Sequence, residues 1–329
     1  MKKIPLLRVL KDFFSTTYDF FLCHKNCKCE AMKHTCPNRT IGCPENIIRD
    51  GFFKRREDSK HIQRFRCRAC GKRFSAVTRS PFYYQKKRRI NSTLAKLLAS
   101  NNSLRRSAWL LGVNRKTIER RVPLFGARFR QLNQRYRAKR KGSVVEVQLD
   151  DLITKENSKL KPVSISILVE AGSRRILGVE VSRIPAFGHL AKLAVQKYGK
   201  REDEHPMGLD RLFREFSQIA HPEVLVKSDE HRRYEYPIHK YLPQAHHKTY
   251  KSERATVAGQ GELKKGGFDP IFTVNHSCAM LRANINRLNR RTWNTTKSIE
   301  RLKDHLEIFI WHYNKHFLPP ELTPFKGSS

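Results

Sequence analysis

The chain has 329 residues, of which 39% are hydrophobic and 10% aromatic, so it can form two or three compact domains and is not disordered. Its 67 lysines and arginines outnumber 30 acidic residues, which gives a formal charge of +37. Self-repulsion of this size indicates a polyanionic partner, and nucleic acid is the first candidate. An anionic membrane surface is the alternative, but no segment has the roughly 18 consecutive apolar residues of a spanning helix.

The first segment, residues 1–22, is predicted to be helical between Pro5 and Leu22 and to pack through its apolar side chains. Its opening resembles a signal peptide for a few residues. Arg8, Lys11 and Asp12 then interrupt the apolar run, so we expect a cytoplasmic protein.

Seven of the eight cysteines are crowded into the next segment, which we predict to be a zinc ribbon over residues 23–80. Without a signal sequence, metal binding explains such a cluster better than disulfides. The motif CRACGKRF has two thiolates two residues apart, which can hold one tetrahedral ion, and a glycine that permits the tight turn beneath it. The motif CPNRTIGC supplies the other half of the site. The predicted Zn²⁺ ligands are Cys36, Cys43, Cys67 and Cys70.

The apolar stretches IIRDGFF and HIQRFR between these motifs suit a hairpin over the metal. Three further cysteines could replace Cys36 or Cys43 as ligands or form an incomplete second site. They are Cys23, Cys27 and Cys29.

Residues 81–141 form a strongly basic region in which Glu119 is the one acid, a pattern typical of a phosphate-binding surface. Apolar residues recur at helical spacing in Thr93–Ser100, Leu104–Leu111 and Lys116–Val122. Gly112 permits a tight turn between the second and third segments.

This turn and the residue after it predict a helix-turn-helix, because Asn114 is a good cap for the helix that follows. The third segment would then be a recognition helix in the major groove of DNA. The alternative is a basic helical linker that reads no bases. The side chains expected to face the groove are Arg115, Lys116, Glu119 and Arg120.

Two short apolar strands in residues 142–329 each deliver a pair of acids. Val144–Leu152 reads as a strand closed by Asp150 and Asp151, and Val224–Glu230 repeats the arrangement with Asp229 and Glu230 at its end. Paired acids at a strand end repel one another and lose solvation, so a metal ion is a natural reason to keep them. Chemistry also collects at the carboxyl ends of strands in α/β sheets. We therefore predict a two-carboxylate metal site.

The other elements of this region complete the predicted fold class, a mixed sheet flanked by helices in an α+β or α/β multidomain chain. After the first strand, two alternating segments form an antiparallel meander, and an amphipathic helix leads to the second acidic strand. The order β-β-β-α-β-α-β-α is the ribonuclease-H-like layout. The segments expected are strands at Pro162–Glu170 and Arg174–Ser182, a helix at Gly208–Ile219, a helix then a strand in Glu235–Lys248, a loop at Ser252–Gly267 and helices at His276–Leu288 and Ile299–His316.

From Cys36 to the carboxyl terminus, the chain resembles the DDE-type transposases of bacterial insertion sequences that combine a zinc ribbon and helix-turn-helix with a ribonuclease-H-like catalytic domain. The motifs that carry the resemblance are CPNRTIGC, RFRCRACGKRFS, QLDDL, KSDE and FTVNHSCAMLRANINRLNRRTW. The resemblance implies metal-dependent cleavage and transfer of double-stranded DNA by a homo-oligomer bound to element ends and target. It also implies a bacterial, nucleoid-associated protein without membrane contact.

In this family the first acid closes the first strand and the second closes the fourth, which implies Asp150 and Asp229 as ligands of Mg²⁺ or Mn²⁺. The third ligand begins the last catalytic helix, seven residues before a basic residue. Arg282 fits the basic position and implies Asn275 as the third ligand, where glutamate is commonest and some relatives use asparagine or histidine. Nearby alternatives for this role are His276 and Glu262. Arg282 and the basic residues after it would hold DNA phosphates.

Two other function classes agree with parts of the sequence. The first is a zinc-ribbon, helix-turn-helix regulator or an inactive transposase remnant, which the asparagine at position 275 favours. The second is a structural nucleic-acid-packaging protein, which the charge favours and the ordered strand-and-acid pattern opposes.

Overall fold

The structure is a computed structural model that describes residues 35–55, 60–75, 78, 82–83, 85–251, 269–289 and 294–319. The chain divides into two compact units, Met1–Lys96 and Leu97–Ser329. Several expectations therefore lie outside the described residues: the helix in residues 1–22, the roles of Cys23, Cys27 and Cys29, and the whole loop Ser252–Gly267, which includes Glu262.

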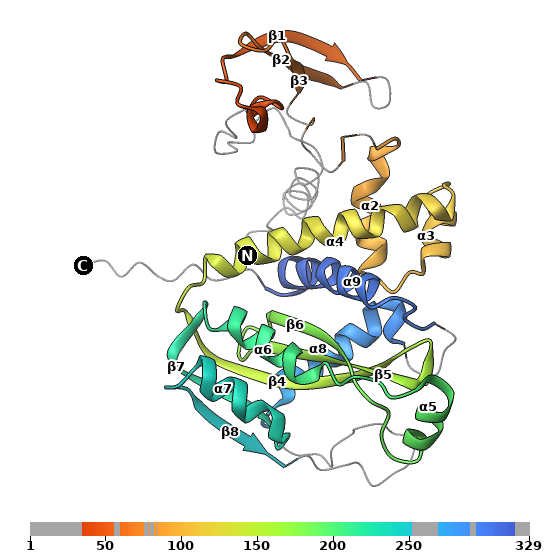
Figure 1. Ribbon diagram of the computed structural model, residues 1–329, viewed down its shortest axis with the longest axis vertical. Coiled ribbons are helices and arrows are strands. Elements are labelled where there is room, and N and C mark those ends of the chain that lie inside the picture. The colour runs from red at the N-terminus through yellow and green to blue at the C-terminus, as the bar shows by residue number, and fades with distance from the viewer. Residues whose placement is uncertain are drawn as a thin grey trace, which may run out of the picture. The chain divides into compact units, whose positions relative to one another are not determined.

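The first unit contains a small antiparallel sheet of three strands, β1 (Ile47–Lys54), β2 (His61–Cys67) and β3 (Arg73–Ser75) (Figure 1). The short helix η1 (Arg39–Ile41) precedes it. β1 and β2 form the predicted hairpin, and Phe65 and Phe74 pack across β2 and β3 with ring centroids 5.7 Å apart. This small apolar contact is the centre of the described sheet.

The predicted helix-turn-helix segments are helical. The helices are η2 (Arg88–Ile90), α2 (Asn91–Leu98), α3 (Leu104–Leu110) and α4 (Arg115–Ala138). Between α3 and α4, Gly112 adopts a left-handed φ of 57°, which glycine allows without strain. The Asn114 side chain accepts a hydrogen bond from the Lys116 N–H at 2.9 Å, which confirms it as the cap of α4.

Helix α4 is much longer than the predicted segment Lys116–Val122. It continues because its later turns bury Phe125 and Phe129 and pack against α9 (Ile299–His312). Gly126 allows this approach, since a Cβ atom there would overlap the Asp304 side chain of α9. The division between the two units therefore falls at residues 96–97, inside the predicted helical region 81–141 and not at its edges.

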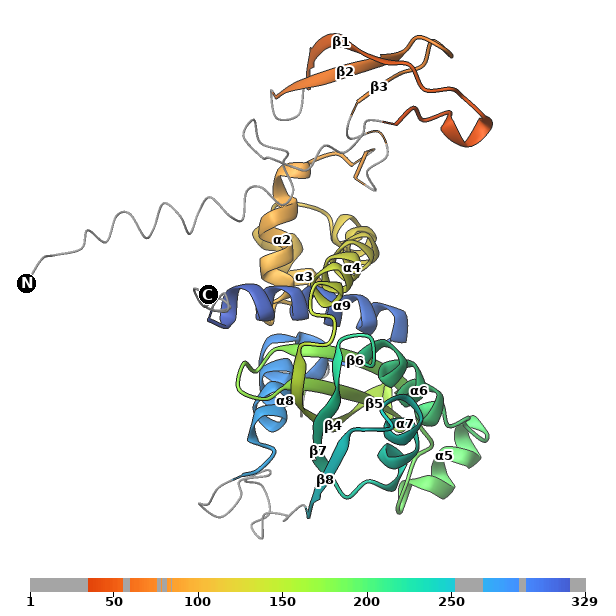
Figure 2. The ribbon, with the colours of Figure 1, turned by 90° about the vertical axis from the view of Figure 1, so that its left-hand side faces the viewer.

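The second unit is built on a five-stranded mixed sheet with the order β6-β5-β4-β7-β8 (Figures 1 and 2). Strands β4, β5 and β6 form the predicted antiparallel meander. β7 pairs in parallel with β4, and β8 pairs in parallel with β7. Their bounds are β4 (Val144–Glu156), β5 (Ser158–Glu170), β6 (Ile176–Arg183), β7 (Ala220–Asp229) and β8 (His246–Tyr250).

Helices cover both faces of this sheet, as Figure 2 shows. Leu149 of β4 packs with α6 and α7, whereas Leu152 packs with α8 and α9, because successive side chains of a strand point to opposite faces. The helix α5 was not predicted. The remaining bounds are α5 (Leu190–Tyr198), α6 (His205–Phe216), η3 (Arg232–Tyr234), α7 (Glu235–Tyr241), α8 (Phe272–Asn284), η4 (Asn286–Leu288) and the π-turn η5 (Tyr313–Phe317).

The prediction that Asp150 and Asp151 close the first strand is wrong. β4 continues to Glu156 because it stays paired with β5 along its whole length, and the two acids lie in its middle. The parallel partner β7 does end at Asp229, as predicted. The second unit is thus a mixed α+β domain, and none of the described helices is long and apolar enough to cross a membrane.

Candidate functional site

The predicted zinc ligands converge in the first unit. Sγ of Cys36 lies 3.4 Å from Sγ of Cys70, and Sγ of Cys43 lies 3.5 Å from Sγ of Cys67. All four sulfur atoms lie within 4.8 Å of one another. A tetrahedron with metal–sulfur distances of about 2.3 Å has edges of about 3.8 Å, so the cluster could bind zinc with little movement.

The surroundings of this cluster favour the thiolate form of Cys67, whereas burial and hydrogen bonds with neighbouring cysteines raise the pKa of Cys36 and of Cys43. Hydrogen bonds from backbone N–H groups, the largest from Cys70, lower the pKa of Cys67 to about 6. The Asn38 N–H points at Sγ of Cys36 at 3.4 Å. Gly71, with a φ of 70°, forms the tight turn predicted beneath the second pair of cysteines, and its N–H donates to the Cys67 carbonyl at 2.8 Å. Four converging sulfur atoms, one of them poised as thiolate, are a donor set that fits a zinc ion.

The two predicted catalytic acids meet on adjacent parallel strands of the second unit. β4 and β7 are in register at Leu149 and Ser228, and the next residue on each strand is Asp150 and Asp229. Parallel neighbours lie about 4.8 Å apart. Four residues before Asp150, Glu146 pairs with Lys227 at 2.6 Å, which fixes the face that Asp150 shares with Asp229. This face is the one covered by α8.

Asp229 is the carboxylate whose charge is least favoured here. Burial raises its pKa, and the negative charges of Asp151 and Glu230 add to the rise. The backbone N–H of His231 donates to its Oδ1 at 3.3 Å and opposes this effect. A raised carboxylate pKa was predicted from repulsion between Asp150 and Asp229, whereas the rise at Asp229 comes first from burial and then from Asp151 and Glu230. Such a group would gain from a cation placed beside it.

The start of α8 is fixed to the same face of β4. Nε2 of Gln148 donates to the Pro270 carbonyl at 3.1 Å, and its Oε1 accepts from the Val274 N–H at 3.0 Å. Asn275 follows in the first turn of α8, and its Nδ2 donates to Oδ2 of Asp269 at 2.8 Å. The side chain that holds α8 is therefore two residues before Asp150, and the amide nitrogen of Asn275 is bound to Asp269.

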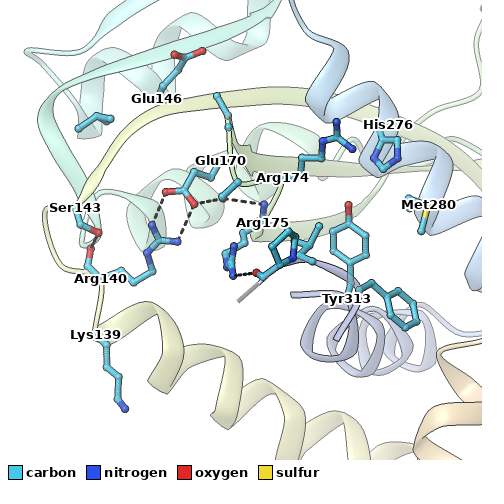
Figure 3. A pocket seen from close by; sticks show the side chains of 17 residues that line it. Lys139, Arg140, Ser143, Glu146, Glu170, Arg174, Arg175, His276, Met280 and Tyr313 are labelled. Carbon is cyan, nitrogen blue, oxygen red and sulfur yellow. Dashed lines mark hydrogen bonds and ion pairs between the residues drawn. The ribbon is translucent and has the colours of Figure 1, made fainter. Parts of the chain in front are cut away.

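The structure separates the other residues proposed on this helix. Arg282 is half-buried two turns after Asn275 on α8. His276, an alternative third ligand, lines a pocket with Arg174 and Tyr313 whose lining includes neither Asp150 nor Asp229 (Figure 3). The role of Asn275 as the third ligand stays a prediction.

Asp151 points to the opposite face of the sheet and joins a buried network that the sequence did not predict. Its Oδ2 lies 2.8 Å from Nε2 of His205, and its Oδ1 accepts from the Ser166 hydroxyl at 2.5 Å. Burial opposes ionisation of Asp151, but the hydrogen bond and charge of His205 hold its pKa below the usual value. Nδ1 of His205 lies 3.4 Å from the Arg233 guanidinium. Because arginine can only donate, Nε2 of His205 carries the proton that faces Asp151.

His231 completes a second group of residues that could hold a metal ion. Ligand atoms of Asp151, His205 and His231 all lie within 4.8 Å of one another. Neither histidine belongs to a recognisable spacing, and the turn after β7 and the start of α6 bring them together. The proline after His205 marks a helix start, but it gives no indication of the contact with Asp151.

The predicted DNA-reading residues lie on the exposed side of the first turns of α4. Arg115, Lys116 and Arg120 are exposed, while Ile118 is buried on the other side. Nε of Arg115 pairs with Glu119 at 2.6 Å, so part of its charge is neutralised within the helix.

Comparison of the chain with protein-family models and with curated proteins found no match.

Proposed function

We propose that the chain is a DDE-type transposase whose second unit has a ribonuclease-H-like fold and cleaves and joins DNA strands. The observation that carries this proposal is the register that sets Asp150 beside Asp229 on adjacent parallel strands. Nothing local in the sequence joins these residues, and a shared cation would be a reason to carry two half-buried acids on neighbouring strands. A sheet in which an antiparallel meander is extended by parallel strands also supports the proposed fold.

Asp150, Asp229 and the amide oxygen of Asn275 are oxygen ligands of the kind that Mg²⁺ or Mn²⁺ prefers. Bound divalent ions would activate water or a DNA 3′-hydroxyl and stabilise the leaving oxygen. In this account Gln148 keeps α8 against the strand, and the His231 N–H holds the Asp229 carboxylate in place. Zn²⁺ at the four cysteines would have a structural role.

The amino-terminal half of the chain would hold the double-stranded DNA. Exposed arginine and lysine at the start of α4 suit phosphate contacts and base reading in the major groove. Arg282 would contact DNA beside the acids. As in the family that the chain resembles, the active form would be a homo-oligomer on element ends and target in the bacterial cytoplasm.

A regulator or inactive remnant is the second candidate, and one observation favours it. Asn275 is already bound to Asp269, which also caps the start of α8 by accepting from the Ile271 N–H at 3.1 Å. In such a protein this pair would only stabilise the helix, and the DNA-binding half would act alone.

A metal-dependent nicking assay on DNA that carries the element's terminal repeats separates these functions. We expect cleavage with Mg²⁺ or Mn²⁺ that Asp150→Asn abolishes, while Glu223→Gln, which removes an exposed acid from the same sheet, leaves it unchanged. Asn275→Glu should keep or raise the rate. Specific binding of the terminal repeats without cleavage by the wild type would favour the regulator, and binding without any end preference would favour a packaging protein.

A further inference from the structure

A large cavity lies on the α8 side of the second unit, and its lining includes neither Asp150 nor Asp229. Its volume is about 1240 Å³. It opens beside Glu146, four residues before Asp150 on β4, which corresponds to about 13 Å along the strand. The turn between β5 and β6, the middle of α8 and the end of α9 form its walls (Figure 3).

Three polar groups converge in this pocket, as Figure 3 shows. The hydroxyl of Tyr313 is directed toward the side where the Arg174 guanidinium and the His276 imidazole lie. Tyr313 is only 1% exposed; Ser277 lies near its hydroxyl and acts to lower its pKa, but no hydrogen bond of normal geometry satisfies this hydroxyl within the described residues. Nδ1 of His276 is also buried without a partner there. Buried polar atoms of this kind cost stability unless a ligand or water satisfies them.

The charge of the pocket favours an anion. Its two acids are already paired with other cations: Glu146 binds Lys227 at 2.6 Å, and Glu170 binds Arg140 at 2.5 Å. Neither neutralises Arg174. The His276 imidazole, whose Nδ1 has no partner within the described residues, can donate an N–H to an anion.

The backbone directs Arg174 to this position. It adopts a left-handed φ of 59°, a conformation that costs a residue other than glycine roughly 1 kcal/mol or more. Its guanidinium carbon lies 5.7 Å from the centroid of the Phe272 ring, which in turn lies 5.9 Å from the ring of His276. The turn therefore places a cation beside an imidazole and a buried hydroxyl.

We propose that this pocket binds a phosphate group carried by a nucleotide, with Arg174, His276 and Tyr313 as its ligands. An arginine fork and two further donors match the oxygens of a phosphate. The remaining volume is lined partly by apolar side chains such as Val145, Met280 and Phe317, which suit a sugar or base. The nucleotide belongs either to a DNA strand or to a free nucleotide. Binding of phosphate in this pocket does not depend on DNA cleavage, so the proposal goes beyond the proposed function.

The test is calorimetric titration of the full chain with inorganic phosphate at constant ionic strength. We expect saturable binding that weakens about tenfold in Arg174→Gln and several-fold in Tyr313→Phe, with the melting temperature of Arg174→Gln unchanged. Lys192→Gln removes an exposed charge from α5 and should bind as the wild type does. Absence of saturable binding in the wild type, or equal weakening in Lys192→Gln and Arg174→Gln, would overturn the proposal.

Competition identifies the source of the phosphate. If a DNA oligonucleotide raises the apparent Kd for phosphate in Lys192→Gln as in the wild type, the ligand is a strand phosphate. If thymidine monophosphate competes and the oligonucleotide does not, the ligand is a free nucleotide. Neither competition experiment measures DNA cleavage. Their results can therefore be interpreted even if the proposed transposase activity is not found.

Discussion

Asp150 and Asp151 are neighbours in the chain but belong to different environments. Asp150 lies on the α8 face beside Asp229, while Asp151 is bound to His205 and Ser166 on the α6 face. The alternation of a β-strand is the cause, because a shift of one residue changes the face. The Asp150 carboxylate is thus available to a cation, whereas the Asp151 carboxylate stabilises the fold through its hydrogen bonds.

The pKa values of Asp151 and Asp229 are shifted in opposite directions, so ionisation of these two carboxyl groups should have opposite effects on the stability of the fold. The folded-state pKa of Asp151 is lowered, so its ionised form stabilises the fold above the usual aspartate pKa, and this contribution is lost as the pH falls through the lowered value. The pKa of Asp229 is raised, so its charge opposes folding at neutral pH, and this penalty disappears as the pH falls through the raised value toward the usual one.

We therefore expect Asp151→Asn to lower the free energy of unfolding at pH 7 by about 1 to 2 kcal/mol. Asp229→Asn should raise or preserve it without added divalent metal. Denaturant unfolding at pH 7 and pH 3 measures both changes, and the difference between each variant and the wild type should shrink at the lower pH. Destabilisation of both variants to the same extent would contradict the assignment of the two environments.

At this scale the sequence identified Asp150 and Asp229 because each follows an apolar run that reads as a strand. It did not identify His205 or His231. Their contact with Asp151 depends on where α6 starts and on the path of the turn after β7, and neither leaves a periodic pattern in the sequence. Asp269 was missed for a similar reason, since it acts as the local cap of a helix whose predicted start was four residues too late.

Most individual elements were predicted, and the errors lie in their lengths. The predicted end of the first strand was wrong because pairing with β5 continues through the acidic pair to Glu156. The predicted end of the recognition helix was also wrong, because tertiary packing of Phe125 and Phe129 on α9 extends α4. Packing over a long sequence separation overrides local propensity in both cases.

The exposed start of α4 predicts a division of roles along one helix. Arg120→Gln should lower the preference for element ends over random DNA by about tenfold, the size expected of one lost base contact. Arg135, which is exposed near the other end of α4, is the matched control. Arg135→Gln should weaken binding to both DNAs by a similar factor. Fluorescence anisotropy at a fixed salt concentration measures both variants, and equal losses for Arg120→Gln would show that the helix acts only as a basic clamp.

For the whole molecule, the sequence predicted a cysteine cluster and a mixed α+β domain, which the structure contains, but it could not show where the chain divides. The break at residues 96–97 follows from the packing of α4 on α9, which joins the long helix to the sheet domain. Hydrophobic patterns show that a helix has an apolar face but not which distant element will cover it.

If zinc binds the four cysteines, the stability of the first unit should depend on that ion more than the stability of the second unit does. Its described sheet buries few apolar side chains, chiefly Phe65 and Phe74, whereas the second unit has two large cores. Chelation of zinc should therefore unfold residues 35–75 and leave residues 97–319 folded. Limited proteolysis with and without chelator measures this, with new cuts expected only near the cysteines. Unchanged resistance after zinc has been removed would mean that the cluster is not structural.

The most direct test of the central claim is a count of bound Mn²⁺ by electron paramagnetic resonance, because it needs no knowledge of the DNA ends. Mn²⁺ prefers oxygen ligands and leaves the thiolate cluster to zinc. If Asp150 and Asp229 hold the catalytic cation, Asp150→Asn and Asp229→Asn should each weaken Mn²⁺ binding by at least about tenfold, while Asp151→Asn, which changes the opposite face of the sheet, should bind as the wild type does. Undiminished binding in the first two variants, or loss of binding in Asp151→Asn alone, would contradict the account and move the metal to the side of His205.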